Sequence, residues 1–253
     1  MAILLLLQND YARAATVPAD DARLAIDNVR YDSSGTKISG YLTRPKAKGK
    51  RPAVIVVHEN RGRNPHIEDI ARRVALEGFL VLVPDLLSVA GGTSADEDQA
   101  RDLHAKTDKT AMLNAALAAI PFLEKHAEST GKVGDVGFCY GGGVVNSMAV
   151  ASADLNAGVA YYGAQPPAAQ VPSIKAPLLL HYGGLDTRIN AGIPEYEAAL
   201  KAAGKRYTIY VYDGVNHAFN NDTGDRYNTP AADLAWSRTI AFFKENLGAP
   251  PAG

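Results

Sequence analysis

The most constraining feature of this 253-residue chain is the pentapeptide Gly137-Phe138-Cys139-Tyr140-Gly141. It lies between an apolar run at residues 132–138 and a segment of small residues at 141–151 that is typical of a helix. A turn that lifts its central side chain off the end of a strand needs a strained backbone and a close strand–helix approach, which glycine tolerates. The pattern therefore predicts a nucleophile elbow with Cys139 at its tip. A buried structural cysteine is the alternative that the pentapeptide alone leaves open.

Apolar runs alternate with amphipathic segments along the rest of the chain. Most of these runs are nearly continuous, as in strands that are buried on both faces of a parallel sheet. A turn-rich connection at residues 32–35 joins the first two into an antiparallel hairpin. The sequence therefore predicts an α/β fold with a mostly parallel, doubly wound sheet of about eight strands and helices on both faces. We expect strands at residues 26–31, 37–43, 53–57, 79–83, 132–138, 158–162, 177–182 and 207–212, and helices at 65–78, within 94–126, and at 141–151, 194–203 and 231–246.

Polar residues follow several of these strands at the point where each strand ends. Nucleophilic catalysis needs a base within hydrogen-bond reach of the nucleophile and a third group that orients the base. Cys139, Asp186 and His217 occur in the order nucleophile, acid, histidine that α/β-hydrolases use. The sequence therefore predicts a thiol nucleophile, with His217 as its base and favouring its thiolate, and Asp186 orienting that base. The backbone N–H groups of Tyr140 and Asn60 are placed to hold an oxyanion.

Each member of this set also has a structural alternative. His217 taken alone is typical of a loop histidine, and Asp186 is in a position to cap a helix near residue 189. A single cysteine excludes an intramolecular disulfide and a multi-cysteine metal site, so we expect neither a metal nor a cofactor. The remaining histidines show no metal-ligand spacing and are interpreted as structural or solvated: His58, His66, His104, His126 and His181.

The charge balance argues against broad classes of partner. With 26 basic and 27 acidic residues the net charge is −1, which gives no general reason to expect nucleic acid or an anionic membrane as partner. No linker or internal repeat divides the chain, so residues 21–253 are predicted to form a single domain. We expect a small-molecule substrate and a monomer or weak homodimer.

The start of the chain resembles the end of an export signal. A short apolar run at residues 3–7 precedes Ala12-Arg13-Ala14-Ala15, a pattern of small residues like a cleavage site. The run lacks a basic start and is too short to span a bilayer. Residues 1–20 are therefore predicted to be an export-signal remnant or an N-terminal extension, with an ordinary helix as the alternative. The first interpretation implies a periplasmic or secreted protein, and the second a cytoplasmic one.

Four short motifs of this chain occur together in one known family. They are Gly-Phe-Cys139-Tyr-Gly-Gly, the aspartate of His181-Tyr-Gly-Gly-Leu-Asp186, Gly-Val-Asn-His217-Ala-Phe, and Val57-His58-Glu59-Asn60. With them, residues 26–247 resemble the dienelactone hydrolase family. The resemblance implies an α/β-hydrolase fold and a carboxymethylenebutenolidase-like hydrolase of carboxylic esters or lactones, with an acyl-enzyme on Cys139.

The resemblance also implies a role for Glu59. In the family the matching glutamate contacts the thiol in the resting enzyme and moves aside when substrate binds, so that substrate switches the nucleophile on. A strand-end glutamate that forms an exposed ion pair with Arg61 or Arg63 is the alternative.

The chain departs from the family at one substrate-binding position. The resemblance implies an arginine four residues after the catalytic histidine, where it holds a substrate carboxylate, but Asn221 occupies that position. Asparagine cannot replace the bidentate, charged pair that arginine forms. Arg61, Arg63 or Arg101 is an alternative source of positive charge, and solvated surface arginines are the structural interpretation of all three.

Neutral esters or lactones are the other predicted substrates. Phe219 and Tyr140 are candidate walls of a pocket for them, and aromatic core packing is the alternative for both rings. Two further functions stay open at this point. One is hydrolysis of another electrophile, a phosphotriester or thioester, by the same triad. The other is a non-catalytic thiol protein in which Cys139 senses oxidation or is merely buried.

Overall fold

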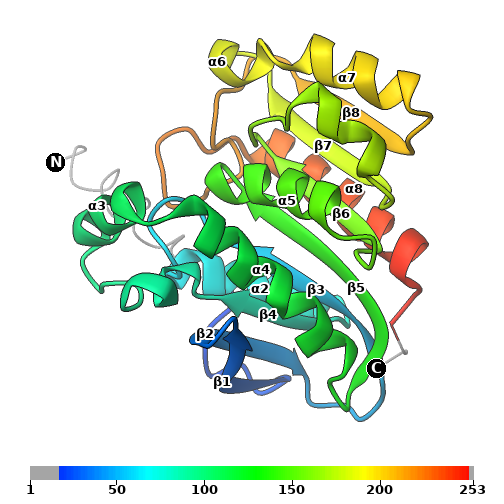
Figure 1. The fold of residues 1–253 in the computed structure, drawn as a ribbon. Coiled ribbons are helices and arrows are strands. Elements are labelled where there is room, and N and C mark those ends of the chain that lie inside the picture. Colours follow the sequence, from blue (N-terminus) through cyan, green and yellow to red (C-terminus); the bar gives the residue numbers. More distant parts are fainter. Residues whose placement is uncertain (1–16, 251–253) are drawn as a thin grey trace, which may run out of the picture.

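Eight strands form one sheet in a computed structural model that describes residues 17–250 (Figure 1). They are β1 (Leu24–Ser33), β2 (Thr36–Pro45), β3 (Arg51–Val57), β4 (Leu80–Pro84), β5 (Ser129–Phe138), β6 (Ala157–Tyr161), β7 (Leu178–Gly183) and β8 (Tyr207–Tyr212). Their order is β1-β2-β4-β3-β5-β6-β7-β8. β2 runs antiparallel to both β1 and β4, and every other neighbouring pair is parallel. The predicted fold class is confirmed.

Most of the helices begin at a capping residue that the sequence supplies. The helices are α2 (Pro65–Leu76), α3 (Glu97–Lys106), α4 (Lys109–Glu124), α5 (Tyr140–Ala151), α6 (Thr187–Asn190), α7 (Ile193–Ala202) and α8 (Thr229–Leu247), with 3₁₀ turns η1 (Leu86–Ala90) and η2 (Ala168–Ser173). Of these, α5 and α7 begin without a side-chain cap. The segment 94–126 forms two helices because Asp108 leaves the helical conformation and caps α4 by accepting a hydrogen bond from the Thr110 N–H. Carboxylates that cap a helix also interact favourably with its N-terminal dipole.

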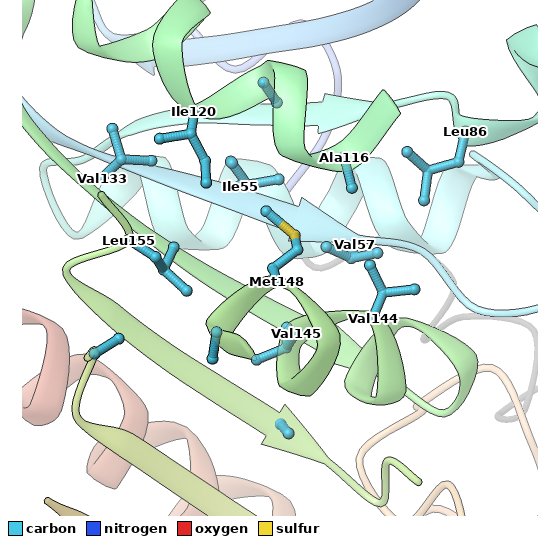
Figure 2. Packing of buried hydrophobic residues seen from close by; sticks show 14 of the residues in the cluster. Ile55, Val57, Leu86, Ala116, Ile120, Val133, Val144, Val145, Met148 and Leu155 are labelled. Carbon is cyan, nitrogen blue, oxygen red and sulfur yellow. The ribbon is translucent and has the colours of Figure 1, made fainter. Parts of the chain in front are cut away.

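The sheet separates two apolar cores. On one face α4, α5 and α7 pack on β3, β5 and β7, and on the other α2 and α8 pack on the same strands. Figure 2 shows the first core, in which Met148 and Val145 of α5 and Ile120 of α4 lie against Ile55 of β3 and Val133 of β5. Every residue of β3 is buried, which explains its continuous apolar run. Because the two helix layers fix the central strands, the loops at their carboxyl ends start from a rigid frame.

The predicted hairpin differs in detail from the structure, and most of the predicted N-terminal extension falls outside the described residues. The connection between β1 and β2 is a two-residue turn, Ser34-Gly35, with φ of 51° and 87°, so the strands are longer than expected. Residues 1–16 of the predicted export-signal remnant lie outside the described range. Val17 is buried, and its N–H donates to Asp69 of α2 at 2.8 Å. No helix within residues 17–250 is long and apolar enough to cross a membrane.

Candidate active site

The predicted elbow is present between β5 and α5. Cys139 has φ of 55° and ψ of −114°, a conformation that side chains rarely adopt. A Cβ atom on Gly137 would lie 2.1 Å from the Gly141 carbonyl oxygen, and one on Gly141 would lie 2.4 Å from the Val57 carbonyl oxygen. Both glycines are therefore required by close backbone contacts. Hydrogen bonds hold the turn on both sides: the Cys139 N–H donates to Tyr161 at 3.1 Å, and the Cys139 carbonyl accepts from the first turn of α5 at 3.2 Å.

The predicted acid and base meet at the same edge of the sheet. Asp186 follows β7 and His217 follows β8, and His217 Nδ1 lies 2.6 Å from Asp186 Oδ2. The other carboxylate oxygen, Oδ1, accepts a hydrogen bond from the Ile189 N–H at 3.3 Å, so Asp186 also caps α6. The two roles proposed for Asp186 are thus both present. With Nδ1 engaged, Nε2 is the His217 nitrogen left to accept a proton.

Glu59 lies two residues after the end of β3, close enough to the elbow for its charge to act on the Cys139 thiol. Its Oε2 accepts a hydrogen bond from Asn221 Nδ2 at 3.1 Å, and its Oε1 is buried with no hydrogen-bond partner among the described residues. Arg61 and Arg63 pair instead with glutamates of α3 and α2, at 3.0 and 3.3 Å. The surface ion pair that was the alternative for Glu59 is therefore not formed. Asn221, where the family pattern has an arginine, contacts this carboxylate.

The thiol is neutral at pH 7 in this arrangement. Burial and the negative charge of Glu59 raise the pKa of Cys139 to about 11. The backbone N–H of Tyr140 and the charges of Arg188 and Arg226 act in the opposite direction but do not outweigh them. This differs from the prediction of a thiolate favoured by the neighbouring imidazole. The thiol of Cys139 is therefore protonated in this structure, and the charge of Glu59 contributes to that state.

Cys139 borders two cavities of different character. The first, of about 750 Å³, is lined by charged and polar residues that include Glu59, Asn60, Arg61, Arg101, His217, Asn221 and Arg226. The second, of about 400 Å³, lies between α4, α5 and the loop after β6, and its lining includes Leu113, Tyr140, Val144, Ala164, Pro166 and Pro167. Cys139 is the one residue common to both linings. Cys139 therefore lies between a polar and an apolar cavity.

The two predicted oxyanion donors come from the start of α5 and from the segment after β3. The Tyr140 N–H begins α5 and interacts with the thiol. Asn60 lines the polar cavity, and its N–H has no protein acceptor in the described part of the chain. Backbone N–H groups at such positions can stabilise negative charge on a substrate oxygen.

Of the two aromatic rings predicted as pocket walls, one is placed elsewhere. Phe219 is fully buried in the core, with ring centroids 5.0 Å from Tyr212 and 5.6 Å from Tyr162, and it lines neither of the two cavities at Cys139. The prediction of Phe219 as a substrate wall is therefore wrong, and core packing describes its place. Tyr140 lines the apolar cavity, where its ring stands edge-on to His104 at 4.3 Å.

Two residues at the site were missed by sequence reasoning. Tyr162, directly after β6, has φ of 40°, and its ring lies 4.8 Å from the His217 ring. Its hydroxyl is buried without a hydrogen-bond partner in residues 17–250. Burial raises the pKa of Tyr162, and the charges of Glu59 and Cys139 raise it further. Arg226 lines the polar cavity and makes no ion pair with any residue that the structure describes. A tyrosine after a strand and an arginine in a loop carry no distinctive pattern.

The remaining histidines do not form a metal centre. His58 and His181 are fully buried, and burial lowers the pKa of both, that of His181 to about 3. Each has both ring nitrogens in hydrogen bonds, His181 with Thr239 and Tyr212. Within the described range no group of three or more His, Cys, Asp or Glu residues could hold a metal ion.

Comparison with known proteins places this geometry in a family. The sequence profile described as the dienelactone hydrolase family matches residues 38–247. A candidate carboxymethylenebutenolidase from Escherichia coli K12 is 32% identical over 265 residues, covering 95% of this chain and 97% of the relative. One from Saccharolobus solfataricus is 30% identical, covering 85% and 96%. The crystal structure of a candidate dienelactone hydrolase from Klebsiella pneumoniae superposes with a TM-score of 0.80 at 29% identity, covering 88% and 99%. The chain that carries this elbow is therefore a hydrolase of the dienelactone hydrolase family.

Proposed function

We propose that this protein hydrolyses carboxylic esters or lactones through a thioester formed on Cys139, with His217 as general base and Asp186 as the residue that orients it. The observation that carries the proposal is the 2.6 Å contact between His217 and Asp186 beside a strained cysteine elbow that opens into a cavity. A thiol that was merely buried, or that only sensed oxidation, would need no such oriented pair.

Glu59 is the switch in this mechanism. With a thiol pKa of about 11, only about one molecule in ten thousand carries a thiolate at pH 7. Part of this elevation comes from Glu59, which a single amide hydrogen bond from Asn221 holds in place. A substrate that enters the polar cavity displaces the carboxylate, the thiol pKa falls, and His217 then takes the proton. The nucleophile is thereby active only when substrate is present.

The proposed reaction uses each of these groups in turn. The Cys139 sulfur forms a bond to the acyl carbon while its proton passes to His217 Nε2. The N–H groups of Tyr140 and Asn60 hold the oxyanion. The carbon–oxygen bond of the ester breaks, and the leaving alkoxide takes the proton from His217. Water then attacks the thioester and gives a proton to His217. The carbon–sulfur bond breaks, the carboxylic acid leaves, and the Cys139 thiolate takes the proton back from His217.

Stoichiometric acylation tests the proposal. Mixing the protein with an activated ester and measuring its mass should show one acyl group on Cys139 and none on Cys139→Ala. We expect His217→Ala to slow labelling at pH 7 by about a hundredfold or more, because general base catalysis contributes at least that factor. His126→Ala serves as the matched control, since His126 lines neither cavity at Cys139. Equal labelling of all variants would contradict the mechanism.

Whether the enzyme prefers an anionic or a neutral substrate is tested by a separate measurement. Arg61 and Arg101 of the polar cavity are paired with acidic residues of α3, whereas Arg226 has no ion-pair partner among the described residues. We therefore propose Arg226 as the cation available to a substrate carboxylate in place of the arginine that Asn221 replaces. Comparing kcat/KM for a dienelactone with a free carboxylate and for a neutral aryl ester tests this. Arg226→Gln should lower the first value much more than the second, because its charge also acts weakly on the Cys139 thiol.

A further inference from the structure

The apolar cavity beside Cys139 has no role in the mechanism above. It lies between the first turns of α4 and α5 and the loop 164–167 after β6, and measures about 400 Å³. Volumes of 300–1,000 Å³ are typical of small-molecule sites. Its walls include Leu113, Val144 and Ala164, and it shares Cys139 with the polar cavity, whereas His217 lines only the polar cavity. The acyl part and the alkoxy part of an ester can therefore bind in separate cavities.

Three polar side chains in the wall of this cavity are engaged within the protein, and Leu113, Val144 and two prolines add apolar surface to the lining. The Ser147 hydroxyl donates to the Gly143 carbonyl at 3.0 Å, and the Gln165 amide donates to the Ile189 carbonyl at 3.1 Å. Lys109 is the one charged residue of the lining, and its ammonium donates to the His104 carbonyl. A group that enters this space consequently meets mainly carbon. Burial of apolar surface is the interaction that such a wall can supply.

The position of His217 decides which part of the ester occupies which cavity. As the carbon–oxygen bond breaks, the leaving alkoxide must receive its proton from His217, so it lies in the polar cavity. The apolar cavity, which His217 does not line, is then the space left for the acyl group. Water that hydrolyses the thioester reaches it from the side that the alcohol has left.

We propose that the cavity on the Tyr140 side is an acyl-chain subsite, and that the preferred substrates are open-chain esters of apolar carboxylic acids. This inference rests on the proposed function, because it needs the acyl group to be transferred to Cys139. An open-chain ester fills both cavities at once. A small lactone cannot do so, since its acyl and alkoxy parts are joined in one ring.

Two ester series test the assignment. In the first the acyl group lengthens from acetate to butanoate, hexanoate and octanoate with one aryl alcohol, and in the second the alcohol lengthens with acetate kept constant. We expect kcat/KM to rise about fourfold for each added acyl methylene until the cavity is full. Lengthening the alcohol should give no such rise.

Variants of the wall should move the preferred chain length in both directions. Ala164→Phe fills the cavity and should lower the ratio of kcat/KM for hexanoate to that for acetate by about tenfold or more. Leu113→Ala enlarges it and should move the optimum toward octanoate. Ala169→Phe places the same ring on an exposed residue that lines neither cavity, and should leave the whole profile unchanged. Circular dichroism of each variant shows whether its fold is retained.

The outcomes separate the subsite from the chemistry. Acylation of Cys139 with a flat dependence on acyl length, or a profile that Ala164→Phe and Leu113→Ala leave unmoved, overturns the subsite and keeps the hydrolase mechanism. If kcat/KM rises with the length of the alcohol instead, the apolar cavity binds the alcohol, and the acyl-chain subsite is overturned. If no ester of either series acylates Cys139, the proposed function fails together with the inference.

Discussion

The loop 218–226 is held differently on its front, the side toward Glu59, and on its back, the side toward α2. At the front, Asn221 touches Glu59 through one amide hydrogen bond of 3.1 Å, and the other carboxylate oxygen has no partner in the described residues. At the back, Asp222 accepts a hydrogen bond from Arg73 of α2 at 2.5 Å and lies 3.2 Å from His66 Nδ1. The loop is therefore fixed by charges behind the site and only lightly held within it.

This difference shows how the site can combine rigidity with a moving part. Burial opposes it, but the hydrogen bond from Arg73 and the close approach of His66 lower the pKa of Asp222 and keep it charged at neutral pH. Arg73 is also paired with Asp69 of the same helix. The anchor keeps the loop after His217 in place, so a movement of Glu59 need not disturb the base.

Removing the Asp222 carboxylate, which anchors the back of the loop, should have the largest effect on the free energy of unfolding. The Asp222 side chain is 6% exposed, and Asp222→Ala leaves buried positive charge without one of its partners. We expect the free energy of unfolding to fall by about 3 kcal/mol, the lower end for breaking a buried ion pair, because Arg73 keeps Asp69. Urea denaturation measures this loss.

Asp225→Ala is the matched control for the anchor. Asp225 belongs to the same loop but is exposed and has no ion-pair partner within residues 17–250. We expect its removal to change the free energy of unfolding by less than about 0.5 kcal/mol. Similar losses in the two variants would show that the back of the loop is no better held than its exposed tip.

Removing the charge of Glu59, at the front of the loop, should change the reactivity of the Cys139 thiol rather than the free energy of unfolding. The Glu59 charge disfavours the thiolate, so Glu59→Gln lowers the pKa of Cys139 from about 11 and raises the thiolate fraction at every pH below it. We expect iodoacetamide to alkylate the variant about tenfold faster at pH 8, with the rate profile displaced to lower pH.

Glu97→Gln is the control for this measurement. Glu97 lines the same cavity, but its charge is paired with Arg61 at 3.0 Å and does not contribute to the raised pKa of the thiol. Its alkylation profile should match that of the wild type. If Glu59→Gln also matched the wild type, burial alone would set the thiol pKa and Glu59 would not be the switch.

The elbow could be predicted from sequence because its requirement is local. Gly137 and Gly141 are needed by backbone atoms within a few residues of Cys139 and by the neighbouring strand, and this leaves a fixed spacing in the chain. The positions of Asp186 and His217 could be predicted because each follows a strand whose apolar run is evident. The order of the strands in the sheet then brings both to one edge.

The contacts between side chains of distant segments could not be predicted in this way. Glu59 and Asn221 are 162 residues apart, and nothing in either segment indicates their hydrogen bond. Phe219 lies two residues after His217, yet it points into the core because the surrounding tyrosines form an aromatic cluster there. Whether an aromatic ring lines a pocket or fills a core depends on packing that the local sequence does not contain.

The smallest expected effect concerns a single hydroxyl at the front of the loop. Tyr162 Oη is buried and unpartnered among the described residues, whereas the hydroxyl of the preceding Tyr161 lies 2.7 Å from Thr239 Oγ1. An unsatisfied buried hydroxyl is destabilising, and a satisfied one is stabilising. Tyr162→Phe should therefore raise the free energy of unfolding by about 1 kcal/mol, and Tyr161→Phe should lower it by about 1 kcal/mol. Equal losses in urea denaturation would mean that Tyr162 finds a partner in solution, and that the front of the site is as well paired as its back.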